Sequence, residues 1–219
     1  MSKENTSDMY TARIAIFIDA SNVWGSYKEM GIMIDFNKLE NAISKKFGGE
    51  IFKTFYFVAY PKKNTREKQI LDGLHRFITF LKKNLKFEII KKPLKIIYLR
   101  NKAGELIYNQ KTGEVEKVEK GNFDVEMAIQ ALKYSSAYDV AVFFTGDSDF
   151  MPLVDYLHGL KNPKKIFIFS TENCVSSELK NCPDEYFDLK DFTEIHGDIL
   201  LYRKERDEKR QKEKNSPSN

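Results

Sequence analysis

The chain has 219 residues, of which 42% are hydrophobic, and a formal net charge of +4 at pH 7, which suits one domain with a substantial core. It contains no run of about 18 uncharged apolar residues, which a membrane helix requires, and its polar start does not resemble a signal peptide. We therefore expect a cytoplasmic protein without a membrane partner, whose two cysteines, in neither a Cys-x-x-Cys nor a zinc-site spacing, are reduced structural thiols.

Strand-like and helix-like segments alternate from the first apolar run onward. Residues 1–11 are polar and are predicted to be a disordered N-terminal tail, whereas residues 14–18 form a continuous apolar run that is typical of a strand covered on both faces in a parallel sheet. The next segments are predicted as a helix from Asp35 that Gly48 ends, a strand at 51–60, an amphipathic helix at 71–85 and a strand at 87–90.

The second half begins with a less regular stretch, residues 93–118, which we interpret as an inserted β-hairpin or meander. The remaining elements are predicted as a helix starting at 124, a buried strand at 140–144, a helix at 151–160, a strand at 166–169, a helix starting at 176 and a short closing strand at 186–189. This alternation predicts an α/β fold with a mainly parallel five- to six-stranded sheet and helices on both faces. We place that domain at residues 12–192 and a charged C-terminal helix or tail at residues 193–219.

Basic residues are concentrated between residues 53 and 102. This segment holds fourteen Lys and Arg residues against three acids, a net charge of +11, so the rest of the chain carries −7. A positive face suits a protein that grips a polyanion through phosphate contacts, although a solvated surface with neutralising neighbours is at least as common. Lys62, Lys63 and Arg66, in the loop after a predicted strand, are the candidate phosphate contacts.

Aspartates follow two of the predicted buried strands. Asp19 ends the first apolar run, Asp147 and Asp149 stand in the turn after residues 140–144, and Asp124 opens a helix. Ligands of open α/β sheets bind at the carboxyl ends of the strands. Clustered carboxylates need a cation to remain ionised together, and hard oxygen ligands select Mg²⁺ or Mn²⁺. We therefore predict that these four aspartates bind a divalent metal at which a phosphodiester is cleaved.

The competing interpretation is that these residues cap helices, because Asp, Asn and Ser are good N-cap residues. For Asn22 and Asp124, capping is the commoner reason for such a residue, and Ser177 is a cap or part of the pocket lining. For Asp149 the two interpretations are balanced. Asp19 and Asp147 follow buried strands, where an unpaired charge is costly, so these two carry the metal hypothesis.

Four segments together resemble the motifs of NYN domains: residues 16–22 (Ile-Phe-Ile-Asp-Ala-Ser-Asn), 120–125 (Lys-Gly-Asn-Phe-Asp-Val), 145–150 (Thr-Gly-Asp-Ser-Asp-Phe) and 177–179 (Ser-Glu-Leu). NYN domains belong to the PIN-like ribonuclease superfamily, within which this chain is most similar to the LabA-like branch, over roughly residues 13–189. The resemblance implies a Rossmann-like (PIN-like) fold, bound Mg²⁺ or Mn²⁺ and metal-dependent cleavage of RNA. It also implies an acidic site made of Asp19, Asp124, Asp147 and Asp149, with Asn22 as its polar support.

The leading hypothesis is thus a metal-dependent endoribonuclease acting on single-stranded or structured RNA, with self-association into a homo-oligomer left open. An RNA-binding or scaffold module without turnover is the alternative, because many relatives carry an Asp where this chain has Gln130. A phosphatase of the haloacid-dehalogenase type is disfavoured, since its nucleophile motif requires a second acid where this chain has Ser21.

Overall fold

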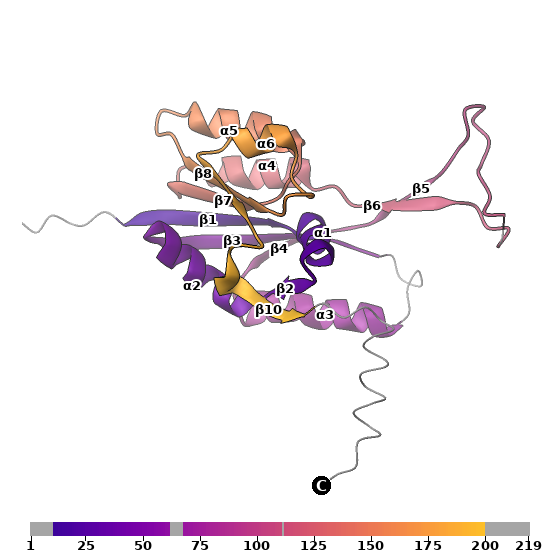
Figure 1. The fold of residues 1–219 in the computed structure, drawn as a ribbon, viewed down its shortest axis with the longest axis horizontal. Helices are drawn as coiled ribbons and strands as arrows, with labels where there is room; N and C mark the ends of the chain where they lie inside the picture. Colours follow the sequence, from indigo (N-terminus) through magenta and orange to yellow (C-terminus); the bar gives the residue numbers. More distant parts are fainter. Residues whose placement is uncertain (1–10, 62–67, 111, 200–219) are drawn as a thin grey trace, which may run out of the picture.

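The computed structural model describes residues 11–61, 68–110 and 112–199, and a six-stranded sheet lies at its centre (Figure 1). The strands run in the order β4-β3-β1-β7-β8-β9, and every neighbouring pair is parallel. Their bounds are β1 (Ala12–Asp19), β3 (Gly49–Tyr60), β4 (Glu88–Pro93), β7 (Val140–Phe144), β8 (Lys165–Ser170) and β9 (Glu185–Asp188). The predicted α/β fold with a mainly parallel sheet is confirmed.

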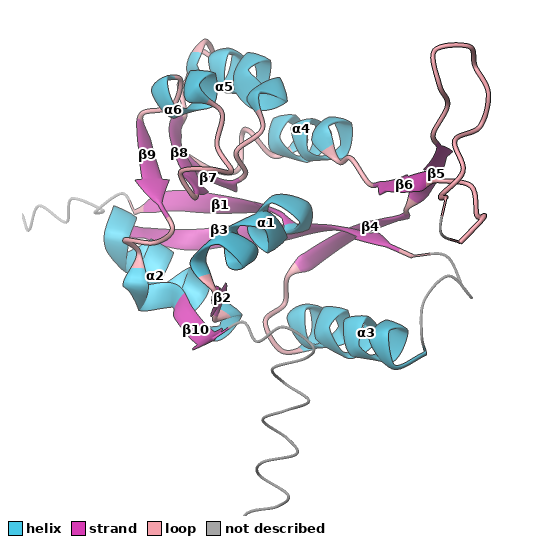
Figure 2. Cartoon of the chain, turned by 45° about the vertical axis from the view of Figure 1, so that its right-hand side comes forward, coloured by secondary structure: helices cyan, strands magenta, loops and turns pink. Residues whose placement is uncertain are grey.

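Helices cover both faces of this sheet (Figure 2). One layer holds α1 (Ala20–Met30), α2 (Phe36–Phe47) and α3 (Lys68–Lys83), and the other holds α4 (Asp124–Lys133), α5 (Met151–His158) and α6 (Ser177–Asn181). Because successive side chains of a strand point to opposite faces, β1 serves both cores. Its Ile14, Ile16 and Ile18 belong to the core under the first layer, and Ala15 and Phe17 to the core under the second.

The two central strands, β1 and β7, are buried almost completely. They pair in register from Ile14 with Val140 to Ile18 with Phe144, and the five residues of β7 are all buried. Apolar side chains on both faces explain why this strand pair has no polar alternation. The carboxyl ends of both strands reach the same edge of the sheet, so Asp19, the last residue of β1, and Thr145, the residue after β7, both come directly after the pair Ile18 and Phe144.

A second, two-stranded sheet was not predicted from the sequence. Strand β2 (Ile32–Ile34) pairs antiparallel with β10 (His196–Ile199), which follows the 3₁₀ helix η2 (Thr193–Ile195). Ile195 is fully buried, and its carbonyl accepts a hydrogen bond from the Asp35 amide at 2.7 Å. Residues 193–199 therefore belong to the folded part of the chain and not to the predicted charged C-terminal helix or tail. Residues 1–10 and 200–219 lie outside the described residues.

The predicted inserted hairpin is present between β4 and α4. Strands β5 (Lys95–Tyr98) and β6 (Lys117–Lys120) pair antiparallel, and two isolated bridges, one of them between Tyr108 and Val115, continue the arm outward. The arm projects from the sheet to one side in both views (Figures 1 and 2). Its returning strand leads through Gly121 into α4, so the arm and the start of α4 are connected by only three residues.

Candidate metal centre

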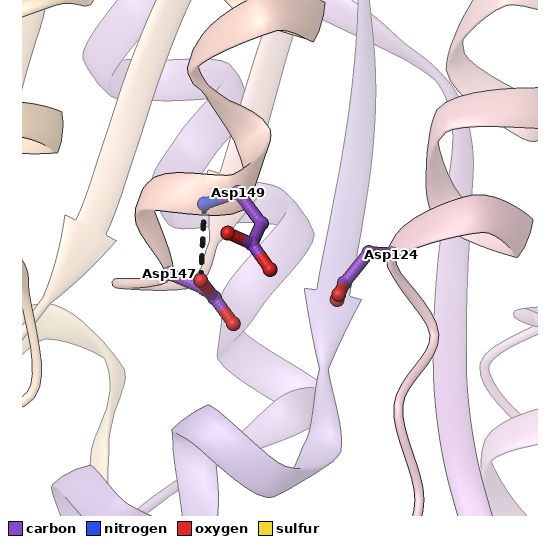
Figure 3. A group of neighbouring side chains, drawn as sticks. All are labelled: Asp124, Asp147 and Asp149. Atoms are coloured by element: carbon purple, nitrogen blue, oxygen red, sulfur yellow. Dashed lines mark hydrogen bonds between the residues drawn. The ribbon is translucent and has the colours of Figure 1, made fainter.

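Three aspartates meet at the carboxyl edge of the sheet. Asp124 is the first residue of α4, and Asp147 and Asp149 stand in the turn between β7 and α5, where Ser148–Phe150 form the 3₁₀ helix η1. One carboxylate oxygen of each aspartate lies within 4.8 Å of the chosen oxygens of the other two. The three side chains border a common space from two sides (Figure 3). The packing of α4 against η1 thus brings together acids from distant segments of the chain.

Asp147, rather than Asp149, caps the turn. The Asp149 amide donates a hydrogen bond of 3.0 Å to Oδ1 of Asp147, which makes Asp147 the N-cap of η1 (Figure 3). The Asp147 amide in turn donates to Oγ1 of the buried Thr145 at 3.3 Å. Among the hydrogen bonds of the described residues, none is accepted by the Asp149 carboxylate. Within the described residues, both carboxylate oxygens of Asp149 are thus free for a ligand, whereas Oδ1 of Asp147 accepts the capping hydrogen bond.

The turn is held against the loop that follows β8. A Cβ atom added at Gly146 would lie 1.9 Å from the carbonyl oxygen of Cys174 and 2.7 Å from Cα of Val175, so no other residue fits without a backbone shift. The Ser176 amide donates a 2.9 Å hydrogen bond to the Gly146 carbonyl across this contact. Close backbone approach of this kind is a standard reason for glycine. It sets the position of both acids in the turn.

Asp124 does not cap its helix either. The N-cap position of α4 is Phe123, which has no side-chain capping bond, and the Asp124 amide donates to Oδ1 of Asn122 at 2.9 Å. The Asn122 amide group donates to Oδ2 of Asp124. Burial raises the pKa of Asp124 above 3.8, the Asn122 hydrogen bond opposes this, and the charges of Asp147 and Asp149 raise the pKa further. The carboxyl of Asp124 thus senses both other acids.

Asp19 flanks this group and is the N-cap of α1. Its Oδ1 accepts hydrogen bonds from the Ser21 amide at 2.9 Å and from the Ser21 hydroxyl at 2.6 Å. Burial raises the pKa of Asp19 above 3.8; the Ser21 hydrogen bonds lower it, and the charge of Asp124 adds a smaller increase. Within the described residues, the group of oxygens within 4.8 Å of one another does not include Asp19. The structure therefore places Asp19 beside the three acids, close enough for the charge of Asp124 to raise its pKa.

Asn22 connects α1 with the end of β8 and is not a cap. Its side chain accepts a hydrogen bond from the Ser170 hydroxyl at 3.1 Å and donates to the Cys174 carbonyl at 3.3 Å. Ser170 is the last residue of β8, and Cys174 lies in the loop after β8 on which Gly146 packs. Asn22 therefore positions the loop beneath the acidic turn.

The remaining predicted substrate contacts are Ser177, Lys62, Lys63 and Arg66. Ser176, not Ser177, caps α6, because its hydroxyl accepts from the Leu179 amide at 3.2 Å. Ser177 is exposed and donates to Glu178 at 3.1 Å. Lys62, Lys63 and Arg66 lie outside the described residues.

Gln130 lies six residues beyond Asp124, about 9 Å further along the axis of α4 at 1.5 Å per residue. Its Oε1 is buried and accepts no hydrogen bond from the described residues. An acid at this position would therefore stand well down the helix from the three clustered carboxylates, so the exchange for Gln leaves that group of acids intact.

The donor set suits a hard divalent cation. Oxygen ligands of Mg²⁺ lie about 2.0–2.1 Å from the ion, so two of them on one ion are at most about 4.2 Å apart. The three aspartate oxygens, all within 4.8 Å of one another, lie close to that spacing. Carboxylates alone, without sulfur or imidazole, favour Mg²⁺ or Mn²⁺ over softer metals. A separate hollow of about 490 Å³ lies at the opposite edge of the sheet, at the amino ends of β1, β7, β8 and β9, away from Asp124, Asp147 and Asp149.

Comparison with known proteins relates the chain to one family. The family model described as "NYN domain" matches residues 13–190. The low amplitude and bright protein LabA of Synechococcus elongatus is 22% identical over 180 residues, covering 82% of this chain and 85% of LabA. A crystal structure of a protein of unknown function from Vibrio parahaemolyticus superposes with a TM-score of 0.61 at 18% identity, over 86% of this chain and 98% of that one. Within residues 11–199, apart from the two short undescribed gaps, no helix is long and apolar enough to cross a membrane.

Proposed function

The chain belongs to the NYN domain family, with LabA supporting its LabA-like branch, and we propose that it is a metal-dependent endoribonuclease that hydrolyses RNA phosphodiesters. The observation that carries the proposal is the meeting of Asp124, Asp147 and Asp149 within 4.8 Å at the edge of the sheet where ligands of such folds bind. Membership of the NYN family supports RNA as the substrate class, and the three acids support metal-dependent hydrolysis as the reaction.

Each acid has a distinct role in the proposed site. Asp149 and Asp124 would hold Mg²⁺ or Mn²⁺, and Asp147 would join them through the oxygen that does not cap η1. A bound ion of this kind supplies Lewis-acid polarisation of the phosphoryl group and a nucleophile at neutral pH. Asp19 adds negative charge beside the group, and Asn22 positions the loop beneath it. We assign phosphate contacts to Lys62, Lys63 and Arg66, and a place at the rim to Ser177, as predictions.

The test is cleavage of labelled single-stranded and structured RNAs in Mn²⁺ and in EDTA. Asp147→Asn is the informative variant, because Asn keeps a capping oxygen for the Asp149 amide while removing the charge. Asp72→Asn, which alters an exposed acid on α3 in the opposite helix layer, is the matched control. We expect wild type and the control to cut RNA only with metal, and Asp147→Asn to lose at least about 100-fold in rate, which is about 2.7 kcal/mol of transition-state stabilisation. Unchanged cutting by Asp147→Asn would remove the acids from the mechanism.

An RNA-binding module without turnover is the second candidate. The observation that favours it is that the carboxylates of Asp19 and Asp147 serve as N-caps, so each has a structural role apart from catalysis. This function requires RNA binding with a steep salt dependence while the RNA stays intact with every metal. The phosphatase alternative gains no support, because the residue two positions after Asp19 is Ser21, which donates to Asp19 rather than supplying an acid.

A further inference from the structure

A groove of about 270 Å³ runs between α4 and α5 and opens at the acidic cluster. Asp124 and Asp149 form its acidic end. Beyond them its lining is apolar and aromatic, made by Ala128, Leu132, Phe150, Pro152, Leu153 and Tyr156. We propose that this groove holds the base of the ribonucleotide that adjoins the phosphate at the acids, with the ring of Tyr156 against the base. The inference rests on the proposed function and names the substrate contact that the function requires.

The walls and the floor of the groove differ in exposure. Tyr156 and Leu132 stand at the surface, 58% and 39% exposed, whereas Phe150 and Leu153 are 2% and 7% exposed and close the floor. Tyr156 and Leu132 therefore present apolar surface to the groove. A flat apolar ring against them would remove this surface from water, which is favourable, without any change in the fold.

Continuity with the acids favours a nucleotide over an apolar protein segment. A protein side chain covering the groove would desolvate the carboxylates of Asp124 and Asp149, which costs free energy unless each charge is paired. A nucleotide would avoid this cost, because a divalent ion held by the acids would neutralise them and attract the phosphate, while the base would lie on the apolar wall. The volume is slightly below the roughly 300–1,000 Å³ of pockets that enclose drug-sized ligands, which suits a single base.

The lining also indicates how a base is recognised. Apart from the two acids and the Tyr156 hydroxyl, the groove residues have no polar side chain. Contact with the face of a base is sequence-tolerant, because every base has a π-face, whereas sequence is read through hydrogen bonds to base edges. The groove therefore accepts a base without reading its identity.

The experiment measures binding rather than cleavage. The full chain is titrated against a fluorescein-labelled uridine 12-mer and against a ribose-phosphate 12-mer that lacks every base, in Ca²⁺, a hard divalent ion for the same oxygens. Gels check that the RNA stays intact. Base stacking contributes about 1–3 kcal/mol, so we expect Tyr156→Ala to weaken binding of the 12-mer by about 5- to 150-fold and to leave the abasic 12-mer unchanged.

Two variants make the result specific to the ring. Tyr156→Phe keeps the ring and should bind the 12-mer within about twofold of wild type. Tyr108→Ala removes a tyrosine of matched exposure, 57%, from the projecting arm and should have no effect comparable to that of Tyr156→Ala. Equal affinity of wild type and Tyr156→Ala for the 12-mer, or equal weakening for both ligands, would overturn the inference.

Failure of the proposed function is distinguishable from failure of this inference. If wild type never cuts RNA in Mn²⁺ but Tyr156→Ala weakens binding only of the base-bearing 12-mer, the base site stands and the nuclease assignment fails. If wild type cuts RNA and the two proteins bind the 12-mer equally, the nuclease stands and the groove has another occupant, such as a protein partner.

Discussion

Replacing Asp149 by Asn should raise the stability of the metal-free protein. The Asp149 carboxylate lies within 4.8 Å of oxygens of Asp124 and Asp147, and no hydrogen bond seen in the described residues ends on it. Asn therefore removes charge and leaves the turn intact. Two unit charges 4.8 Å apart repel by about 0.9 kcal/mol at the dielectric constant of water, and salt reduces this value. For the two pairs together we expect the free energy of unfolding to rise by about 1 kcal/mol.

The same substitution should have the opposite effect when metal is present. An ion at 100 times its Kd stabilises the folded protein by about 2.7 kcal/mol. Each tenfold loss of affinity removes about 1.4 kcal/mol of this gain, and Asp149→Asn removes the charge of one of the three proposed ligands. The order of stability between wild type and variant should thus reverse between EDTA and Mn²⁺.

Urea unfolding followed by circular dichroism measures both free energies, with Asp72→Asn as the control for loss of an exposed acid. The reasoning is refuted if Mn²⁺ stabilises wild type and Asp149→Asn equally. A loss of stability in EDTA would also refute it, because Asp149 would then have a structural partner.

The remaining predictions concern neighbouring parts of the site. Asp19→Ala should cost about 0.5–2 kcal/mol through loss of the cap on α1, whereas Asp19→Asn should stay close to wild type; thermal unfolding separates the two. Gly146→Ala should lower the free energy of unfolding by more than about 1–3 kcal/mol, because its Cβ meets the Cys174 backbone, and a urea midpoint near that of wild type would contradict the contact. Burial raises the pKa of Asp124 in the folded protein. Protonation of Asp124 therefore stabilises the fold at low pH, and this contribution to the free energy of unfolding is lost as pH rises through the raised pKa. The stability of Asp124→Asn relative to wild type should therefore increase in EDTA from about pH 4 to about pH 7, and a flat difference would argue against the shift.

The central strands could be predicted because their sequences have one explanation. The run at residues 140–144 is apolar at every position, and β7 has those bounds. By contrast, β2 has only three residues, and β10 begins His-Gly-Asp, which has neither apolar alternation nor β propensity. Their pairing depends on the approach of residues far apart in the chain, so a local pattern does not contain it.

The sequence predicted the position of the acids that follow a buried strand. It did not predict which of these acids accepts the local hydrogen bonds of the turn. Asp147 and Asp149 lie at the carboxyl end of β7, as the apolar run before them indicated. Which of them caps the turn depends on backbone angles that composition does not report, and Asp147 has that role. The nearness of Asp124 required α4 to pack against η1, whereas Asp19, equally prominent in the sequence, lies beside the group.

The burial of residues 14–18 in β1 and of all of β7 has a consequence for the dynamics of the acids at the ends of these strands. Amide hydrogens in the best-packed strands of a domain exchange with solvent only when the whole domain unfolds, whereas loops open locally at low cost. The turn at residues 145–150 has Thr145 and Gly146 buried between such a strand and the Cys174 backbone. Its amides should therefore exchange at rates closer to those of the sheet than to those of the projecting arm, and the geometry of the acids should persist until the domain itself unfolds.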